Sequence, residues 1–345
     1  MKSIKKLYRI GRGPSSSHTM APRKAAEQFL TRNTDADHFL VTLYGSLAAT
    51  GKGHMTDAAI LEILEPAAPV TIDWQPQTFL PFHPNGMNFK ALRKDDSVID
   101  DWTVYSVGGG ALAEEGKRKE DTPEVYGMGH IVDIIRYCRT NGRTIWEYVE
   151  ECEGKEIWDY LREVWRVMRE AVERGIVAEG VLPGPLHLQR KAAQYNIKSS
   201  GYAASLHSRG LVFSYALAVS EENAAGGTIV TAPTCGSCGV LPGVLYHLWK
   251  SRDFPEIRIL HSLATAGLIG NIAKHSASIS GAEAGCQAEV GVACAMASAA
   301  SCQLFGGSPM QIEYAAEMGL EHHLGLTCDP VCGLVQVPCI ERNAY

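Results

Sequence analysis

The pattern of apolar and polar residues along the chain predicts several helices. Two of them lie near the N-terminus, at residues 21–32 and 57–64, where apolar residues recur at helical spacing. Residues 131–142 and 157–175 show the same spacing, and each segment ends at a glycine, which commonly stops a helix. One face of the last segment collects the apolar side chains of Ile157, Leu161, Val164, Met168 and Val172. From there to the end, the pattern indicates mostly helix.

Two short segments in the first third are typical of β-strands. Residues 70–74 (VTIDW) and 101–110 (DWTVYSVGGG) are rich in β-branched and aromatic residues. The following residues, 111–125, are charged and interrupted by glycine and proline, as in a linker between domains. The sequence therefore predicts an α+β N-terminal domain over residues 1–125, followed by an all-α domain over residues 126–345.

Composition and charge exclude several classes of protein. The chain has 345 residues, of which 46% are hydrophobic and 20% charged, as in ordinary globular proteins. Its formal net charge of −6 argues against a nucleic-acid partner, because such proteins are usually basic. The first residues are positively charged but lack the apolar stretch of a signal peptide. No run approaches the ~18 apolar residues of a membrane span. We expect a soluble, cytoplasmic protein with no nucleic-acid or membrane partner.

The cysteines suggest a site in the last third of the chain. Most of the ten cysteines lie there, and thiols of a cytoplasmic protein stay reduced. Cys294 and Cys302 stand in an alanine-rich run and are predicted to be packing residues. Cys286, Cys328 and Cys339 instead lie in segments shaped by glycine and proline. Spacing alone leaves open whether these three bind a metal, and zinc and iron–sulfur would both accept thiolates.

Two polar motifs stand in the N-terminal domain. Residues 11–19 (GRGPSSSHT) fit neither a helical nor a strand period. Residues 44–57 (YGSLAATGKGHMTD) superficially suggest a phosphate loop. That motif has four residues between its first glycine and the Gly–Lys pair, followed by Ser or Thr. Here five residues separate Gly45 from Gly51–Lys52, and a glycine follows the lysine. The second motif is therefore predicted to be a Gly-rich turn that presents Lys52, His54, Thr56 and Asp57.

A third motif lies in the predicted helical domain. Residues 226–245 (GGTIVTAPTCGSCGVLPGVL) run from a short strand-like piece into the start of an apolar helix. Backbone amides at a helix N-terminus attract anions, such as the carboxylate of a substrate. A simple connector with glycines in its turns would have the same sequence pattern, so this motif is suggestive only.

Together, these motifs resemble the bacterial iron–sulfur L-serine dehydratases (L-serine ammonia-lyases) of the single-chain type. The matching stretches follow the family's order from residue 13 to residue 343: GPSSSHTMAP, LYGSLAATGKGHMTD, HPNGMNF, YSVGGG, ENAAGGTIVTAPT, SASISGAEAGCQAEVG and CDPVCGLVQVPCIERN. The resemblance implies a first domain similar to the allosteric substrate-binding domain of some phosphoglycerate dehydrogenases, and an all-helical catalytic domain. It also implies a homodimer that uses no pyridoxal phosphate.

The resemblance further implies a [4Fe–4S] cluster with one open iron. The matching cysteines are Cys286, Cys328 and Cys339, whereas Cys332 is interpreted as a bystander. An open iron is a Lewis acid that can bind the hydroxyl and carboxylate oxygens of L-serine and stabilise the departing hydroxide. A positioned base removes the Cα proton. The aminoacrylate so formed becomes an imine and hydrolyses to pyruvate and ammonia.

We hypothesise that the SSSHT segment is a lid or wall over this cluster. Ser16, His18 and His54 are the candidate catalytic residues, and a histidine or a serine oxygen would be the base. The candidate substrate-binding residues are Ser15, Ser17, Thr19, Lys52, Thr234, Gly236 and Ser237. The last three are weaker candidates, because CGSCG stands here where single-chain relatives often have Asn–Gly–Ala.

Several alternatives stay open at the level of sequence. The chain ends six residues after Cys339, so we expect a C-terminal truncation relative to the family. A non-enzymatic alternative is an amino-acid-binding regulatory module whose cysteines hold a structural zinc or pack. An electron-transfer protein would normally use four cysteine ligands and need no SSSHT segment. A dehydratase acting on threonine or cysteine fits as well, because one methyl group changes pocket affinity only modestly.

Overall fold

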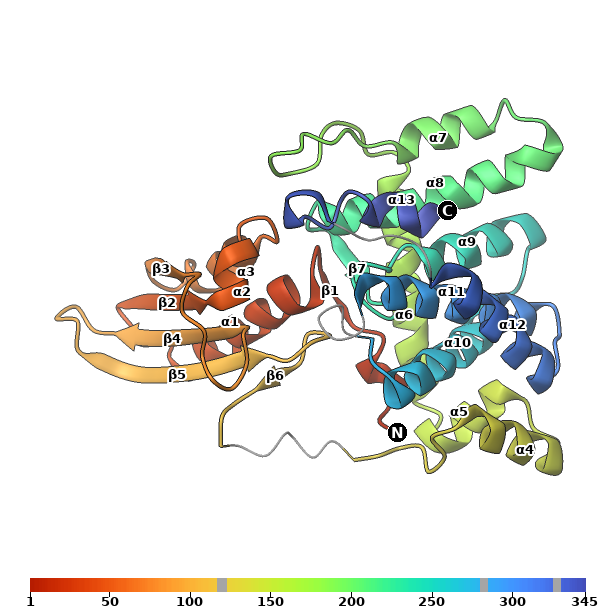
Figure 1. The fold of residues 1–345 in the computed structure, drawn as a ribbon, viewed down its shortest axis with the longest axis horizontal. Helices are drawn as coiled ribbons and strands as arrows, with labels where there is room; N and C mark the ends of the chain where they lie inside the picture. The colour runs from red at the N-terminus through yellow and green to blue at the C-terminus, as the bar shows by residue number, and fades with distance from the viewer. Residues whose placement is uncertain (117–122, 280–284, 325–329) are drawn as a thin grey trace. The chain divides into compact units, whose positions relative to one another are not determined.

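The computed structural model describes residues 1–116, 123–279, 285–324 and 330–345, with side chains from residue 288 onward in the third range. The chain divides into two compact units. One, the α/β unit, comprises Arg12–Asp121 with Cys332–Leu334. The other, the helical unit, comprises Met1–Gly11, Thr122–Val331 and Val335–Tyr345. The predicted fold class is confirmed, since a mixed sheet with helices is followed by a region that is largely helical (Figure 1).

A five-stranded sheet in the order β3-β2-β4-β5-β6 organises the α/β unit. The strands are β2 (His38–Tyr44), β3 (Val70–Gln75), β4 (Gly86–Leu92), β5 (Val98–Ser106) and β6 (Leu112–Ala113). The first pair is parallel, with Val41 opposite Ile72, and β2 pairs antiparallel with β4, with Val41 opposite Phe89. The strands β2 and β4 were not among the sequence predictions. The apolar run of β2 does not alternate, because residues on both of its faces are largely buried. In β4, Met87 and Phe89 do alternate with Asn88 and Lys90, a strand signal that the sequence analysis did not use.

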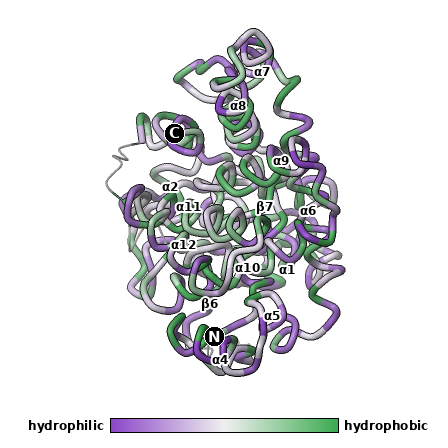
Figure 2. Tube along the Cα trace, turned by 90° about the vertical axis from the view of Figure 1, so that its right-hand side faces the viewer, coloured by the Kyte–Doolittle hydropathy of each residue, from purple (hydrophilic) through white to green (hydrophobic). Residues whose placement is uncertain are grey.

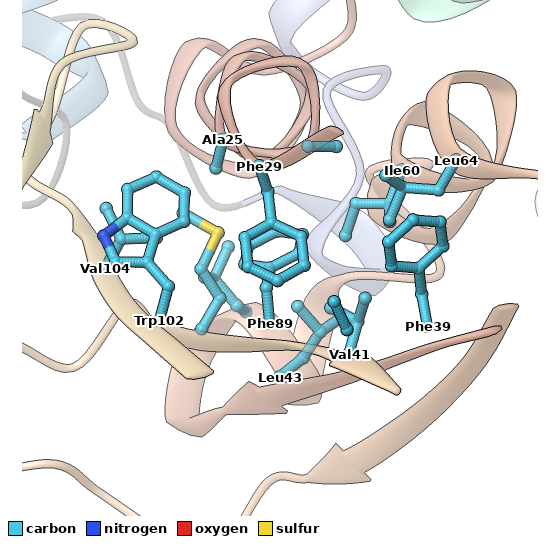
Figure 3. Packing of buried hydrophobic residues seen from close by; sticks show 14 of the residues in the cluster. Ala25, Phe29, Phe39, Val41, Leu43, Ile60, Leu64, Phe89, Trp102 and Val104 are labelled. Atoms are coloured by element: carbon cyan, nitrogen blue, oxygen red, sulfur yellow. The ribbon is translucent and has the colours of Figure 1, made fainter. Parts of the chain in front are cut away.

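Three helices bury their apolar side chains against this sheet. They are α1 (Ala21–Arg32), α2 (Gly45–Thr50) and α3 (Thr56–Leu64). Phe29 of α1 is fully buried and lies at the centre of an aromatic group (Figure 3). Its ring centroid is 5.5 Å from that of Phe89 and 6.2 Å from that of Trp102. This core holds α1 and the polar segment before it in place on the unit.

Replacing Phe29 with alanine is expected to destabilise the protein by about 3–5 kcal/mol, because the change leaves a cavity among close-packed aromatic rings. Urea unfolding followed by circular dichroism measures this loss. Phe79→Ala is the control, since that side chain is 64% exposed and its loss should leave the unfolding curve nearly unchanged. Equal effects of the two substitutions would contradict the assignment of Phe29 to the core.

The helical unit contains ten α-helices within the described residues. They are α4 (Ile131–Asn141), α5 (Ile145–Glu153), α6 (Ile157–Gly175), α7 (Ala192–Ser199), α8 (Ala204–Ala224), α9 (Val240–Arg252), α10 (Glu256–Ser276), α11 (Gly285–Leu304), α12 (Pro309–His323) and α13 (Cys339–Ala344). The mixture of hydrophilic and hydrophobic positions along α6 is visible in Figure 2 and matches its buried apolar face. None of the described helices combines the length and apolar character needed to cross a membrane.

The first residues of the chain pack against α10 of the helical unit. The terminal amino group donates to the backbone carbonyl of Tyr126, and Ile4 and Tyr8 are fully buried. They approach α10 at Gly267, where an added Cβ would lie 2.8 Å from Tyr8 and 3.1 Å from Ile4. The missing side chain of Gly267 therefore lets the N-terminal segment pack closely against α10. Strand β1 (Ile10–Arg12) follows and pairs with β7 (Thr228–Val230).

Candidate active site

The SSSHT segment of the α/β unit forms one short turn of π-helix, Ser16–Met20. The sequence analysis assigned it to neither helix nor strand, because a single π-turn has no repeating pattern to detect. Ser15 caps the turn by accepting a hydrogen bond from the backbone amide of His18 at 3.2 Å. Thr19 donates to the backbone carbonyl of His54 at 2.7 Å. The turn is thereby joined to the second polar motif of the unit.

The second motif is partly helical, which corrects the expectation of a Gly-rich turn over its whole length. Helix α2 begins at Gly45, directly after β2, and only residues 51–55 form the turn that carries His54. Met55 adopts a left-handed conformation with φ 56°, and α3 starts at the next residue. The turn is held from both sides, because Thr56 donates to the backbone carbonyl of His18 at 2.5 Å.

His18 and His54 lie together, with ring centroids 4.8 Å apart. Both ring nitrogens of His18 are engaged by hydroxyls: Nδ1 lies 2.9 Å from Ser17 Oγ, and Nε2 lies 3.1 Å from Ser46 Oγ. His54 differs, because its Nδ1 lies 2.9 Å from the backbone carbonyl oxygen of Thr50. The structure therefore distinguishes two histidines that the sequence left equivalent.

The hydrogen bond to Thr50 determines the tautomer of His54. A carbonyl oxygen only accepts, so Nδ1 of a neutral His54 must carry the proton and Nε2 must hold the lone pair. In the part of the chain that the structure describes, Nε2 forms no hydrogen bond. This nitrogen is a base whose lone pair is not engaged, whereas both nitrogens of His18 are occupied.

Burial favours the neutral form of both histidines. Burial, with a smaller contribution from the neighbouring His54, lowers the pKa of His18 to about 3. Burial also lowers the pKa of His54, against an opposing effect of its bond to Thr50. A lowered pKa means that each ring releases its proton at lower pH than an exposed histidine does. His54 is thus available as a proton acceptor over a wide range of pH.

The other predicted residues of this unit do not all lie at the two histidines. Ser16 is buried, and Ser15 Oγ lies 3.4 Å from Ser17 Oγ. The Lys52 ammonium lies over the ring of Trp74, with its nitrogen 5.6 Å from the ring centroid. The SSSHT residues and His54 are therefore brought together, but within the described residues Lys52 makes no contact with the two histidines. Ser46, which the sequence analysis did not single out, stands inside the quoted motif 44–57.

The helical unit contains the predicted substrate loop. The Thr234 and Ser237 hydroxyls lie 3.2 Å apart, and Ser237 donates to the backbone carbonyl of Ala232 at 3.3 Å. Both side chains are at most 5% exposed. Across the loop, an added Cβ on Gly236 would lie 2.9 Å from Oε2 of Glu289 in α11. The loop is therefore a buried turn in close contact with α11.

Asn343 of α13 connects this loop with Cys339. Its Oδ1 accepts from the backbone amide of Gly239 at 2.9 Å. Its Nδ2 donates to the carbonyls of Gly236 at 2.8 Å and Cys339 at 2.7 Å. The amide that precedes α9 is thus occupied by Asn343, where the sequence suggested an anion. Asn343 was missed by the sequence analysis, although it ends the CIERN stretch quoted there.

Replacing Asn343 with alanine is expected to lower the free energy of unfolding by about 2–4 kcal/mol, because three buried hydrogen bonds are lost at about 0.5–1.5 kcal/mol each. Urea denaturation measures the change. Asn141→Ala is the matched control, since its amide makes one exposed bond to Tyr137 and its loss should cost little. Equal midpoints for the two variants would show that Asn343 does not hold the loop.

The three candidate cysteine ligands are described unequally. Cys339 is the first residue of α13 and is 9% exposed. Cys286 is placed only as a helical position, one turn before Glu289 in α11, and Cys328 lies outside the described residues. Within the described residues, no three His, Cys, Asp or Glu side chains are arranged to hold a metal ion. The bystander Cys332 is exposed, with φ 56°.

Of the three candidate ligands, only Cys339 has a described side chain, and its chemistry and surroundings suit an iron–sulfur cluster. Thiolates are the usual ligands of such clusters, and Cys339 lies in a buried, water-poor setting. The Gly236 loop is connected to Cys339 through Asn343 and approaches α11 one turn after Cys286. At Gly236, the missing side chain leaves the space that a Cβ would fill beside Glu289. Two of the three candidate positions therefore belong to helices that meet the same loop.

Residues Cys332–Leu334, which precede Cys339 in the sequence, belong to the α/β unit. An added Cβ on Gly53 would lie 2.6 Å from Leu334 Cδ2. A Cβ on Gly333 would lie 3.8 Å from Thr50. Leu334 is 2% exposed, so this packing is close. The turn that carries His54 therefore packs against Cys332–Leu334 within the α/β unit.

Comparison with known proteins matches the whole chain to one family. Residues 45–345 match the family model described as "Serine dehydratase alpha chain", and residues 3–77 match "Serine dehydratase beta chain". The L-serine dehydratase of Haemophilus influenzae is 41% identical over 100% of this chain and 88% of its own length. L-serine dehydratase 1 of Escherichia coli is 40% identical, over 100% of this chain and 87% of its own. The chain belongs to the serine dehydratase family.

Proposed function

We propose that this protein is an L-serine ammonia-lyase that converts L-serine to pyruvate and ammonia with the help of a [4Fe–4S] cluster. Relatives named L-serine dehydratase, about 40% identical over the full chain, support the reaction. The observation that carries the mechanism is the unprotonated Nε2 of His54, whose tautomer is set by the carbonyl of Thr50.

His54 is the general base in this mechanism. Its Nε2 takes the Cα proton of serine, the electron pair of the C–H bond forms the Cα–Cβ double bond, and the hydroxyl leaves from Cβ. His18 does not compete for the proton, because hydroxyls of Ser17 and Ser46 engage both of its nitrogens. His18 instead packs its ring against that of His54 and keeps the latter oriented. A positioned base of this kind contributes about 10²–10⁴-fold to a rate.

Cys286, Cys328 and Cys339 would hold the cluster. When bound, the cluster would supply an iron that acts as a Lewis acid toward the hydroxyl of serine. Asn343 would keep Cys339 in register with the 234–239 loop, because it bonds to both. Neither pyridoxal phosphate nor a fourth cysteine ligand is part of this proposal.

The remaining polar residues are proposed to bind the substrate. In the α/β unit these are Ser15, Ser16, Ser17, Thr19 and Lys52, with Ser16 as a further catalytic candidate. In the helical unit they are Thr234, Gly236 and Ser237. Their hydroxyls and amides can exchange the bonds they make within the protein for bonds to the carboxylate and ammonium of serine. We also propose that the protein acts in the cytoplasm as a homodimer.

Anaerobic purification of the full chain, followed by reconstitution with ferrous iron and sulfide, tests the proposed function. We expect a brown protein that forms pyruvate from L-serine, detected by a coupled lactate dehydrogenase assay. The same assay with threonine or cysteine in place of serine tests whether the enzyme prefers one of these amino acids. Pyruvate formation that survives removal of iron by a chelator would contradict the role of the cluster. A colourless protein that forms no pyruvate would contradict the proposal as a whole and favour an amino-acid-binding module.

A further inference from the structure

One charged group near Cys339 has no described partner. Arg342 lies in α13 and is 7% exposed. Its Nε and Nη2 atoms are both buried, and within the described residues neither has a hydrogen-bond partner. The backbone of the residue is well held, because its amide donates to the carbonyl of Pro338 at 3.0 Å. The main chain of Arg342 is therefore held in α13, while two nitrogens of its guanidinium have no partner among the described residues.

An unpaired buried guanidinium is costly for a folded protein, because the charge loses its hydration and gains no partner in return. Arg190, a largely buried arginine of the same unit, shows how such a charge is usually compensated. Arg190 pairs with Glu222 at 2.9 Å, and each side chain is 11% exposed. Arg342 departs from this rule, which indicates that its partner is an anion that the described chain does not supply.

The surroundings of Arg342 place it at the predicted catalytic segment. It stands three residues after Cys339 and directly before Asn343, which bonds to the substrate loop at Gly236. Its charge acts on Cys294 of α11, where it opposes the effect of burial on the pKa of that thiol. A guanidinium presents parallel N–H donors that match the two oxygens of a carboxylate. The amino-acid substrate of the proposed reaction carries such a carboxylate.

We propose that Arg342 binds the carboxylate of the amino-acid substrate. This inference rests on the proposed function and adds to it the residue that selects an α-amino acid. It also accounts for a buried guanidinium that has no partner among the described residues, because the substrate would supply that partner.

The test compares Arg342→Gln and Arg342→Met with Arg190→Met in the full chain. In the reconstituted enzyme, we expect Arg342→Gln to raise the KM for L-serine on the order of 10- to 100-fold, because charge-assisted hydrogen bonds are lost. The Ki of D-serine should rise in parallel, whereas that of ethanolamine, which lacks the carboxylate, should stay unchanged. Iron content should equal that of the wild type.

A second readout requires no activity. In urea unfolding of the iron-free chain, Arg342→Met should keep or raise the midpoint, because an unpaired buried charge is removed. Arg190→Met should lower it, because a paired charge is broken. A lower midpoint for Arg342→Met, a loss of iron, or equal effects on D-serine and ethanolamine would overturn the proposal. If the wild type formed no pyruvate, the proposed function would fall, but equilibrium dialysis with radiolabelled L-serine would still decide the role of Arg342.

Discussion

Replacing His54 with glutamine is expected to lower kcat by about 10²–10⁴-fold, the usual contribution of a positioned general base. The hydrogen bond between Nδ1 of His54 and the carbonyl of Thr50 fixes the tautomer, so that Nε2 carries the lone pair that accepts a proton. Glutamine preserves much of the volume but has no basic nitrogen. The measurement is pyruvate formation from L-serine by the reconstituted enzyme, with iron content determined on the same samples.

A matched control for this substitution exists in the same unit. His38 lies in β2, with its Nε2 3.1 Å from the exposed carboxylate of Asp96, and His38→Gln should leave kcat unchanged. His18→Gln separates the base from its neighbour, because it removes the ring that packs on His54 but leaves the Thr50 bond. We expect an intermediate loss for that variant. A His54→Gln enzyme as active as the wild type would eliminate this residue as the base.

The pH dependence of kcat/KM follows from the same environment. The base works only when deprotonated, and burial lowers the pKa of His54 below its usual value of 6.5. The rate should therefore hold as pH falls through 6.5 and decline only at lower pH. An acid limb centred at or above pH 6.5 would indicate a more exposed base elsewhere.

Replacing Cys339 with serine is expected to lower the iron content at least 10-fold and to abolish serine deamination. Cys339 is the buried first residue of α13, and a hydroxyl is a much poorer ligand for iron than a thiolate. Losses of 10- to 100-fold in metal affinity arise even from residues behind the ligands, so the loss of a ligand should do at least as much. Iron analysis and the visible spectrum of the reconstituted protein measure the effect.

Cys332→Ser is the control for the cysteine experiment. Cys332 lies seven positions before Cys339 but is exposed, and we expect its substitution to change neither iron content nor turnover. If Cys332→Ser has no effect, the iron lost from Cys339→Ser is due to the loss of a ligand and not to the removal of any cysteine from this segment. If Cys339→Ser kept its iron while Cys332→Ser lost it, the proposed set of ligands would be wrong.

Much of the fold was predictable from the sequence because its signals are local. The helix at 157–175 places its apolar residues on one face, and the structure has α6 at Ile157–Gly175. The predicted helix at 131–142 ends at Gly142, which adopts the left-handed conformation expected of a helix stop. The strand β2 was not predicted, since a strand buried on both faces does not alternate and its assignment depends on the neighbours it acquires. The strand β4 was missed although Met87 and Phe89 alternate with Asn88 and Lys90.

The sequence alone determined the order of the motifs, the family and the set of residues that are candidates for catalysis and binding. Only the tertiary structure decided how those residues differ. His18 and His54 are equivalent in sequence, but hydroxyls occupy one ring and a backbone carbonyl sets the tautomer of the other. Asn343 bonds to Gly239 across 104 positions of chain. Such differences arise from hydrogen bonds between distant segments, and a hydrogen bond depends on where atoms lie in space.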